Sequence, residues 1–343
     1  MRIGYSFWGF LEEYEDSIFA QTPDGLRLSR PLLVNEFLFR GHRIFCMQDR
    51  REKKRYPEAV YEKGLPDLDV LFVEWRWPTY KNFGKEKREP DWDRQVELLD
   101  HYCNNETRVI VLDTDHKVRL EDEKRWPQME ICDPSFRPKT ISKERSWLPI
   151  WTDFKRLFDA PEYSYCYGYV GNRYEREDSI RKYYGIPSAA LRNAGVQTIM
   201  WGNWLQKSPE REDPSKIIAH YPTLSFGLRR GFYESMEILS GLNATTHISK
   251  DDYYETGYVS PRVFEAMQCG VPALVPYEHN ILHCLGEEWV VRTSGDVIDK
   301  VEYLSKLSKN ERENIVQQQL EGLTAFADFS VRGVANFIEG LNR

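Results

Sequence analysis

Residues 260–276, with the sequence SPRVFEAMQCGVPALVP, decide the expected fold of this chain. Ser260 suits the N-cap of a helix, Pro261 suits its first position, and Gly270 suits the residue that ends it. The apolar residues 271–275 then predict a short buried strand that Pro276 closes. We therefore expect a helix of roughly two to three turns, followed directly by a strand.

Arg262 and Glu265 lie three residues apart, so they share one face of that helix near its positive end. A helix N-terminus and a guanidinium can together hold a diphosphate, and a carboxylate one turn further on can accept hydrogen bonds from both hydroxyls of a ribose. The pair therefore predicts a sugar-nucleotide site. The alternative is an ordinary ion pair on the surface of a helix.

The composition is typical of a soluble globular protein with more than one core. The 343 residues are enough for two domains, with 41% hydrophobic and 29% charged residues. No apolar run approaches the ~18 residues of a membrane span, and the N-terminus begins as a strand without a signal-peptide pattern. Six cysteines lack CxxC spacing and suggest reduced thiols. We expect a cytoplasmic protein without a membrane partner.

The net charge of −7 argues against a general binder of polyanions, but it leaves room for a local basic surface. Lys and Arg gather in three short segments, at residues 50–55, 85–88 and 137–139. Each segment can also be a solvated loop with no partner.

Strands and helices alternate in the first half of the chain. The expected strands are residues 2–8, 43–47, 68–73 and 109–112, and the expected helices are residues 31–40 and 96–103. Alternation of this kind predicts a parallel sheet whose ligand-facing loops lie at the carboxyl ends of the strands. Asp115 follows the fourth strand and is expected at such an end.

A second series of strands and helices follows a Pro-rich and aromatic segment at residues 134–161. Its expected strands are residues 163–170, 197–201, 244–248 and 271–275. We predict an α/β fold with two Rossmann-like domains, residues 1–160 and 161–325. A terminal helix within residues 326–343 is expected to pack back towards the N-terminal domain.

This layout resembles the GT-B glycosyltransferases, whose two Rossmann-like domains face each other across a cleft. It is similar above all to the DNA β-glucosyltransferases of T-even bacteriophages, which add a sugar to 5-hydroxymethylcytosine in phage DNA. A Thr-Asp pair with a catalytic base closes a strand in that family, and Thr114-Asp115 matches it here. The positions that match the family's donor-binding residues are Gly171, Arg173, Arg176, Gly202, Asn203, Arg262 and Glu265.

The resemblance implies inverting transfer from a UDP-sugar to hydroxymethylated cytosine in double-stranded DNA. Such a reaction needs one base to deprotonate the acceptor hydroxyl and positive groups to hold the departing diphosphate. Asp115 is the candidate base, and a turn or capping residue is the alternative. The Asp113-x-Asp115 spacing is weak evidence for a metal, so no metal ligand is assigned. The resemblance also allows a divalent cation, Mg²⁺ or Mn²⁺, at the diphosphate.

Two departures from the family's pattern leave the identity of the sugar open. Bulky and acidic residues occupy the early loop, at positions 8, 10, 12 and 13, where the family has small residues and Asn. Ser29 and Arg30 stand where the family has an acidic residue at the start of the first helix.

On the acceptor side, a DNA base must leave the stack before its hydroxymethyl group can be modified. Trp75, Arg76 and Trp77 follow the third strand and are candidates to contact DNA, with packing in the core as the alternative. His116 is a further candidate, although a turn residue is the more ordinary explanation. We expect a monomer. The other possible functions are transfer to a polysaccharide, protein or small molecule, and binding of a nucleotide sugar or DNA without catalysis.

Overall fold

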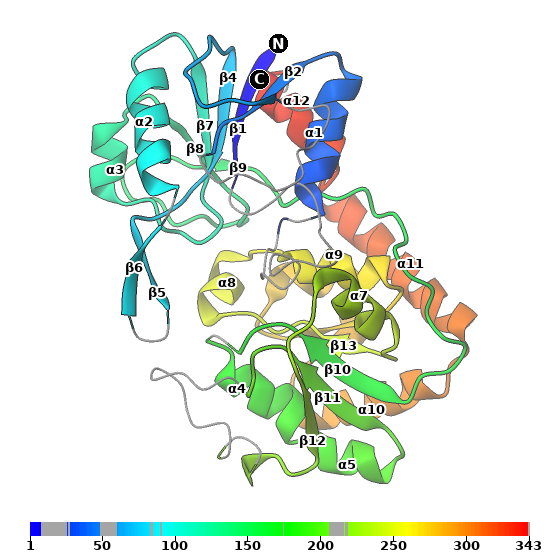
Figure 1. Cartoon of the computed structure of the whole chain (residues 1–343). Coiled ribbons are helices and arrows are strands. Elements are labelled where there is room, and N and C mark those ends of the chain that lie inside the picture. Colours follow the sequence, from blue (N-terminus) through cyan, green and yellow to red (C-terminus); the bar gives the residue numbers. More distant parts are fainter. Residues whose placement is uncertain are drawn as a thin grey trace. The chain divides into compact units, whose positions relative to one another are not determined.

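The computed structural model describes residues 1–7, 26, 28–48, 60–82, 85–89, 91–173, 175–205, 216 and 219–341 (Figure 1). The chain divides into two compact units. Unit 1 contains the described residues up to Asp153 together with residues 329–341, and unit 2 contains Phe154–Asp328. The division therefore falls earlier in the chain than the boundary at residue 160 expected from the sequence.

Unit 1 is built on a seven-stranded sheet with the order β3-β2-β1-β4-β7-β8-β9, in which every neighbouring pair is parallel. The strands are β1 (Arg2–Ser6), β2 (Arg43–Cys46), β3 (Val60–Tyr61), β4 (Val70–Glu74), β7 (Arg108–Leu112), β8 (Glu130–Asp133) and β9 (Ser146–Trp147). The central strand β4 is buried at every residue. Burial on both faces explains its continuous apolar sequence.

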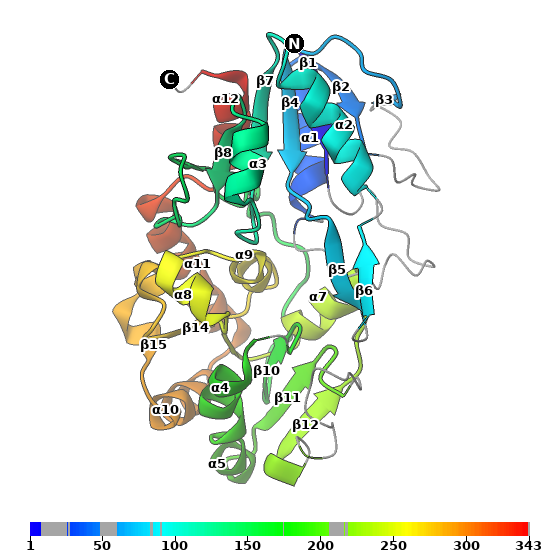
Figure 2. The same cartoon turned by 90° about the vertical axis from the view of Figure 1, so that its left-hand side faces the viewer.

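Helices cover both faces of this sheet. Helices α1 (Ser29–Phe39) and α12 (Val331–Glu339) lie on one face, and α2 (Trp92–Tyr102) and α3 (Leu120–Arg125) lie on the other (Figures 1 and 2). Arg40 at the end of α1 donates to Asn336 in α12 at 2.8 Å, and Arg108 donates to the carbonyl oxygens of two residues of α12. The last helix of the chain is thereby fixed to unit 1. An antiparallel hairpin, β5 (Thr79–Asn82) and β6 (Lys85–Arg88), follows β4.

Unit 2 contains two groups of parallel strands that one bridge joins. The first group is β12 (Leu224–Gly227), β11 (Gln197–Trp201) and β10 (Cys166–Val170), and the second is β13 (Thr245–Thr246), β14 (Ala273–Pro276) and β15 (Val290–Val291). A parallel bridge between Tyr167 and Ala244 places β13 beside β10. The strand order is therefore β12-β11-β10-β13-β14-β15, and it reverses direction between β10 and β13. Ligands of open α/β sheets bind at this kind of switch point.

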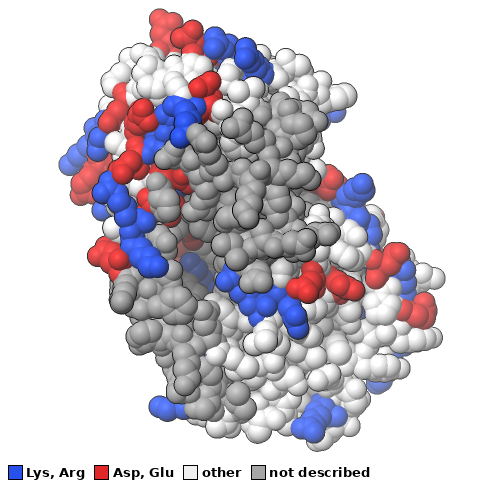
Figure 3. All heavy atoms as spheres, viewed as in Figure 1, with Lys and Arg blue, Asp and Glu red and all other residues white. Residues whose placement is uncertain are grey.

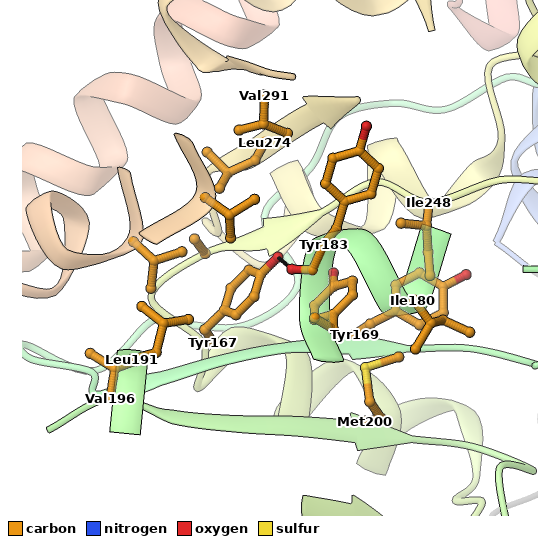
Figure 4. Close-up of a cluster of buried hydrophobic side chains, with 14 of the residues drawn as sticks. Tyr167, Tyr169, Ile180, Tyr183, Leu191, Val196, Met200, Ile248, Leu274 and Val291 are labelled. Carbon is orange, nitrogen blue, oxygen red and sulfur yellow. Dashed lines mark hydrogen bonds between the residues drawn. The ribbon is translucent and has the colours of Figure 1, made fainter. Parts of the chain in front are cut away.

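The core of unit 2 is rich in tyrosine. One cluster joins the sheet to α4 (Glu177–Ile180), the π-helix η1 (Arg181–Gly185), α5 (Ser188–Asn193) and α10 (Ser294–Ser305). Within it, the hydroxyl of Tyr167 donates to the carbonyl oxygen of Tyr183 at 2.9 Å (Figure 4). A second cluster packs α7 (Phe232–Ser240) against β10. The remaining helical segments are α8 (Asp251–Thr256), α9 (Pro261–Gln268), η2 (Asn280–Leu285), η3 (Glu287–Trp289) and α11 (Lys309–Phe326).

The stretch at residues 260–276 forms the predicted helix and strand, α9 and β14. Pro261 is the first residue of α9, and Gly270 adopts φ +68° just after its end. Ser260 has the extended backbone of an N-cap, but its side chain makes no capping hydrogen bond, which differs from our expectation. Pro276 is the last residue of β14 and not the residue after it.

Several elements differ from the sequence-based expectation. The strand expected at residues 163–170 begins only at Cys166. Strand β12, helices α5 and α8, and the β5–β6 hairpin were not predicted. All six cysteines are free thiols. None of the described helices is long and apolar enough to cross a membrane.

Candidate active site

Two glycine-containing loops meet at the carboxyl ends of β10 and β11. The backbone N–H of Gly171 donates to the carbonyl oxygen of Trp201 at 2.9 Å, and the backbone N–H of Arg173 donates to Oδ1 of Asn203 at 3.0 Å. Gly202 has φ +143°, and a Cβ atom added to it would lie 2.0 Å from the carbonyl oxygen of Gly171. Both the backbone angle and the close approach require glycine at this position. Four of the predicted donor-binding residues are thus held together by hydrogen bonds and by a close backbone contact.

The loop after β10 carries two of the predicted arginines. Arg173 is buried, and its Nε atom lies 3.3 Å from a carboxylate oxygen of Glu177. Arg176 is partly exposed, and its Nη1 atom donates to the carbonyl oxygen of Asn172 at 3.4 Å. Both guanidinium groups therefore have partners within the loop and the start of α4 that follow β10.

The third predicted arginine, Arg262, lies in the first turn of α9 and forms an ion pair with Glu265. Nη1 of Arg262 is 2.5 Å from Oε2 of Glu265. The pair expected as the ordinary alternative is therefore present, but it is not a surface pair, because Glu265 is only 4% exposed. A buried carboxylate with a cation beside it can accept hydrogen bonds from a ligand through its oxygen atoms.

His247, which no sequence motif identified as a candidate, lines a cavity together with Arg262. The expected strand at residues 244–248 is shorter in the structure, and its end at Thr246 places His247 in the loop at the switch point. His247 is 3% exposed and lines a cavity of about 10 Å³ with Tyr169 and Arg262. A histidine close to the end of an expected strand was the signal that could have identified it.

The electrostatic environment of His247 shows that positive charges converge here. Burial holds the pKa of His247 well below its usual range, and the nearby His279, Arg176 and Arg262 lower it further. Two guanidinium charges, from the loop after β10 and from the start of α9, therefore lie near one histidine. Such a concentration of positive charge favours an anionic ligand.

In unit 1, the turn after β7 is organised by Asp113. This residue is fully buried, and its carboxylate accepts the backbone N–H groups of Lys117 and Val118 at 2.7 and 2.9 Å. Arg145 donates to the same carboxylate at 2.9 Å. Burial raises the pKa of Asp113, and these hydrogen bonds oppose the rise. Asp113 therefore shapes the turn that carries Asp115.

His116 belongs to the same structural network. It has φ +54°, and its Nε2 atom lies 3.1 Å from Oγ of Ser135 and 3.3 Å from a carboxylate oxygen of Asp133. Burial acts to raise the pKa of Asp133, but the hydrogen bonds from His116 and Ser135 outweigh it, and the pKa is lowered. These contacts make His116 a turn residue and give no support to an acceptor-binding role.

Asp115 differs from Asp113 in its accessibility. Asp115 is partly exposed, two residues beyond the buried Asp113, at the carboxyl end of β7. It sits on a turn that Asp113 and Arg145 hold in place. The position agrees with what a base needs, and the catalytic role of Asp115 stays a prediction.

The predicted DNA contacts at residues 75–77 need correction. Trp75 is buried between the rings of Trp92 and Trp126. Arg76 is 1% exposed. Its guanidinium donates to the hydroxyl of Ser6 at 3.2 Å and to the carbonyl oxygen of Phe7, which follows β1. Both residues therefore serve the core of unit 1, and we do not retain them as acceptor contacts. Trp77 is partly exposed and stays a candidate.

Arg30 is also part of the core of unit 1. Its Nε and Nη2 atoms each lie 2.7 Å from a carboxylate oxygen of Glu74, and the hydroxyl of Tyr5 donates to the same carboxylate at 2.7 Å. Ser29 donates to the carbonyl oxygen of Trp151 at 2.7 Å. The two residues that depart from the family's pattern thus have structural partners.

No metal site is evident in the described parts of the chain. No group of three His, Cys, Asp or Glu side chains among these residues could hold a metal ion. The Asp113-x-Asp115 spacing does not provide one, because both oxygens of Asp113 already accept hydrogen bonds.

Charged side chains of both signs lie on the described surface. On the face shown in Figure 3, Lys and Arg side chains are interspersed with Asp and Glu over the described residues. Residues 86–88 of β6 are exposed, and Arg88 forms an ion pair with Asp93. The basic segment at residues 50–55 lies outside the described residues.

Comparison with known proteins places this geometry in context. Residues 187–339 match a family model described as "Glycosyl transferase-like". No curated protein matches the sequence. Among solved structures, T4 phage β-glucosyltransferase in complex with UDP-glucose aligns with a TM-score of 0.61 at 14% identity, over 100% of this chain and 98% of that one. The same phage enzyme in complex with UDP and Mn²⁺ aligns with a TM-score of 0.60 at 13% identity, over 100% and 99%.

A glycosyltransferase involved in avilamycin A biosynthesis is also similar, with a TM-score of 0.53 at 12% identity over 99% of this chain and 98% of that one. At these identities the likeness establishes the fold, which is the predicted α/β fold of the GT-B type. The matched glycosyl transferase-like segment covers most of unit 2 and includes Gly202, Asn203, Arg262 and Glu265. The chain therefore has the GT-B fold, and residues 187–339 within it match a glycosyl transferase-like family model.

Proposed function

We propose that this enzyme transfers a sugar, with inversion, from a UDP-sugar to the hydroxyl of 5-hydroxymethylcytosine in DNA. The observation that carries the donor half is the switch point of unit 2, where the loop with Arg173 and Arg176 and the helix with Arg262 and Glu265 share one sheet edge. The acceptor half is supported by the full-length alignment with T4 phage β-glucosyltransferase.

In this proposal the diphosphate of the donor binds the N-terminus of α9 and the three arginines. Each charge-assisted contact contributes about 1.5–3 kcal/mol. Glu265 accepts hydrogen bonds from the ribose hydroxyls, since its buried carboxylate lies beside Arg262 in the same helix. Gly171, Gly202 and Asn203 support the donor indirectly, because they fix the loop that presents Arg173.

Asp115 is the proposed base. It removes the proton from the acceptor hydroxyl as the hydroxyl oxygen attacks the anomeric carbon. The bond between that carbon and the diphosphate oxygen breaks, and its electron pair stays on the departing diphosphate. The arginines stabilise that negative charge.

A divalent cation, Mg²⁺ or Mn²⁺, is compatible with a donor that carries a diphosphate, and one of the similar structures contains UDP and Mn²⁺. The described residues supply no ligand set for such an ion. We therefore assign no step of the reaction to it.

A polysaccharide, protein or small molecule is a second candidate acceptor. The net charge of −7 favours it, and the burial of Trp75 and Arg76 removes two expected DNA contacts. The fold also occurs in the avilamycin A glycosyltransferase.

One assay separates these possibilities. The purified protein is incubated with a panel of UDP-sugars and with two DNA duplexes of the same sequence, one containing 5-hydroxymethylcytosine and one containing cytosine. Mass spectrometry of the nucleosides is expected to show a hexose or pentose adduct on the modified base alone. UDP release without any DNA adduct would support the second acceptor class and would contradict the proposal for DNA.

A further inference from the structure

We propose that His247 is a ligand of the donor's diphosphate, to which it donates a hydrogen bond from Nε2 as a neutral imidazole. This inference rests on the proposed function and adds a residue to the donor site. The first support is position, because His247 directly follows β13 at the point where the strand order of unit 2 reverses.

The second support is an unused polar atom. His247 is 3% exposed, and Nε2 has no hydrogen-bond partner within the described residues. A buried polar atom without a partner costs about 1–3 kcal/mol, and each such atom in a native fold calls for an explanation. The imidazole lines the same small cavity as the side chain of Arg262. A ligand held by Arg262 would therefore come within reach of the ring.

The third support is the charge state of the ring. Arg262 from α9, Arg176 from the loop after β10, and His279 from the segment after β14 all face His247. Burial, followed by these three groups, keeps the pKa of His247 well below its usual range. A neutral imidazole carries one N–H donor, so it can bind a phosphate oxygen without placing a third positive charge beside two guanidinium groups.

A neutral imidazole that donates a hydrogen bond also suits the departing diphosphate. The electron pair of the broken glycosyl bond stays on a diphosphate oxygen, and the acceptor's proton goes to Asp115. No proton has to pass from His247 to the diphosphate. The histidine stabilises the anion by a hydrogen bond alone.

The alternative is a histidine that serves only the core of unit 2. The cavity of about 10 Å³ has room for one water molecule, which could satisfy Nε2 without any ligand. In that case His247 would contribute to stability but not to recognition of phosphate. The two explanations differ in which part of the nucleotide the residue affects.

Isothermal titration calorimetry with UDP and with uridine separates them. His247→Leu removes the donor, and His247→Gln keeps an amide N–H. We expect His247→Leu to weaken the binding of UDP about tenfold and the binding of uridine less than twofold, since one charge-assisted hydrogen bond to the diphosphate is lost. We expect His247→Gln to recover UDP affinity to within about threefold of the natural protein.

His279→Leu is the matched control. His279 is fully buried, its ring centroid lies 5.7 Å from that of His247, and its Nε2 atom is 3.0 Å from the carbonyl oxygen of Tyr258. Its loss is expected to leave the ratio of UDP to uridine affinity unchanged. An unchanged ratio in His247→Leu as well would overturn the inference while leaving the proposed function intact.

A measurement on the unmodified protein covers the case in which His247→Leu does not fold. Nuclear magnetic resonance of the histidine ring nitrogens is expected to show a shift of Nε2 of His247 when UDP is added, and no shift with uridine. A ring that responds to neither nucleotide, in a protein that binds UDP, would overturn the inference. Failure of the natural protein to bind UDP would instead overturn the proposed function, and the inference with it.

Discussion

Asn203 accepts a hydrogen bond from the backbone N–H of Arg173 at 3.0 Å, so the loop after β11 holds the loop after β10. This contact explains how an uncharged residue can influence the binding of an anion. It fixes the backbone from which the Arg173 side chain departs.

Asn203→Ala is expected to weaken UDP binding about fivefold, because a hydrogen bond of about 1 kcal/mol that positions Arg173 is lost. Titration calorimetry measures the change. Asn104→Ala is the control, since the side chain of Asn104 also forms a hydrogen bond with the backbone, as a donor to the carbonyl oxygen of Asp100, but in unit 1. Equal UDP affinity in the natural protein and in Asn203→Ala would show that the loop does not need this contact.

Asp115→Asn is expected to lower kcat at least ~100-fold while UDP affinity stays nearly unchanged, because the base is lost and the donor contacts remain. Single-turnover assays with the accepted sugar and acceptor measure the effect. Asp113→Asn is the comparison and should instead lower the free energy of unfolding, since Asp113 anchors the turn through Lys117, Val118 and Arg145. Unchanged turnover in Asp115→Asn would remove this residue from the mechanism.

Glu265→Ala is expected to weaken UDP binding and to abolish any preference for UDP over its 2′,3′-dideoxy form. The reason is that the buried carboxylate is the proposed acceptor for the ribose hydroxyls. Competition binding with the two nucleotides measures the preference. If the variant retains both the affinity and the preference, Glu265 only forms an ion pair with Arg262.

Gly202→Ala is expected to destabilise unit 2 by more than 2 kcal/mol, a rough figure for a substitution that combines unfavourable φ with a backbone clash. Its added Cβ would lie 2.0 Å from the carbonyl oxygen of Gly171. Urea unfolding gives the change. Gly195→Ala is the matched control, because Gly195 also has positive φ, at +82°, with nothing within 4 Å of an added Cβ. A similar loss in both variants would show that backbone strain alone, and not the close approach, determines the cost.

Lowering the pH is expected to destabilise unit 2 through His279, whose pKa burial lowers to about 4. Between that value and the unfolded value near 6.5, the unfolded chain binds a proton that the folded unit does not. The stability contribution is therefore complete above about pH 6.5 and is lost towards pH 4, by up to about 3 kcal/mol.

Urea unfolding at a series of pH values tests this effect, with His279→Gln as the variant that cannot titrate. In the variant, the free energy of unfolding should fall less steeply between pH 6.5 and pH 4 than in the natural protein. His247 is expected to add to the slope in the same direction, since its pKa is also lowered. The same slope in the variant and the natural protein would contradict the assignment to His279.

The sequence alone was enough to predict the fold class. Short apolar runs that alternate with helix-period segments predict parallel strands joined by helices. These sequence patterns reflect the local geometry of each element, so they can be read without the tertiary structure. The helix that begins at Pro261 and ends before Gly270 was predicted from capping preferences that act over a few residues. Gly202 was found through its match to a family motif, and the structure supplies the physical reason for it.

Tertiary structure alone decided which polar residues serve the core and which remain available. Arg76 follows a predicted strand and Arg30 precedes a predicted helix, yet both are buried with partners from distant parts of the chain. His247 became a candidate only when the short strand β13 was placed beside β10. Local sequence determines secondary structure through backbone preferences. Burial, partners and charge state depend on contacts between residues far apart in the chain, and these exist only in the folded protein.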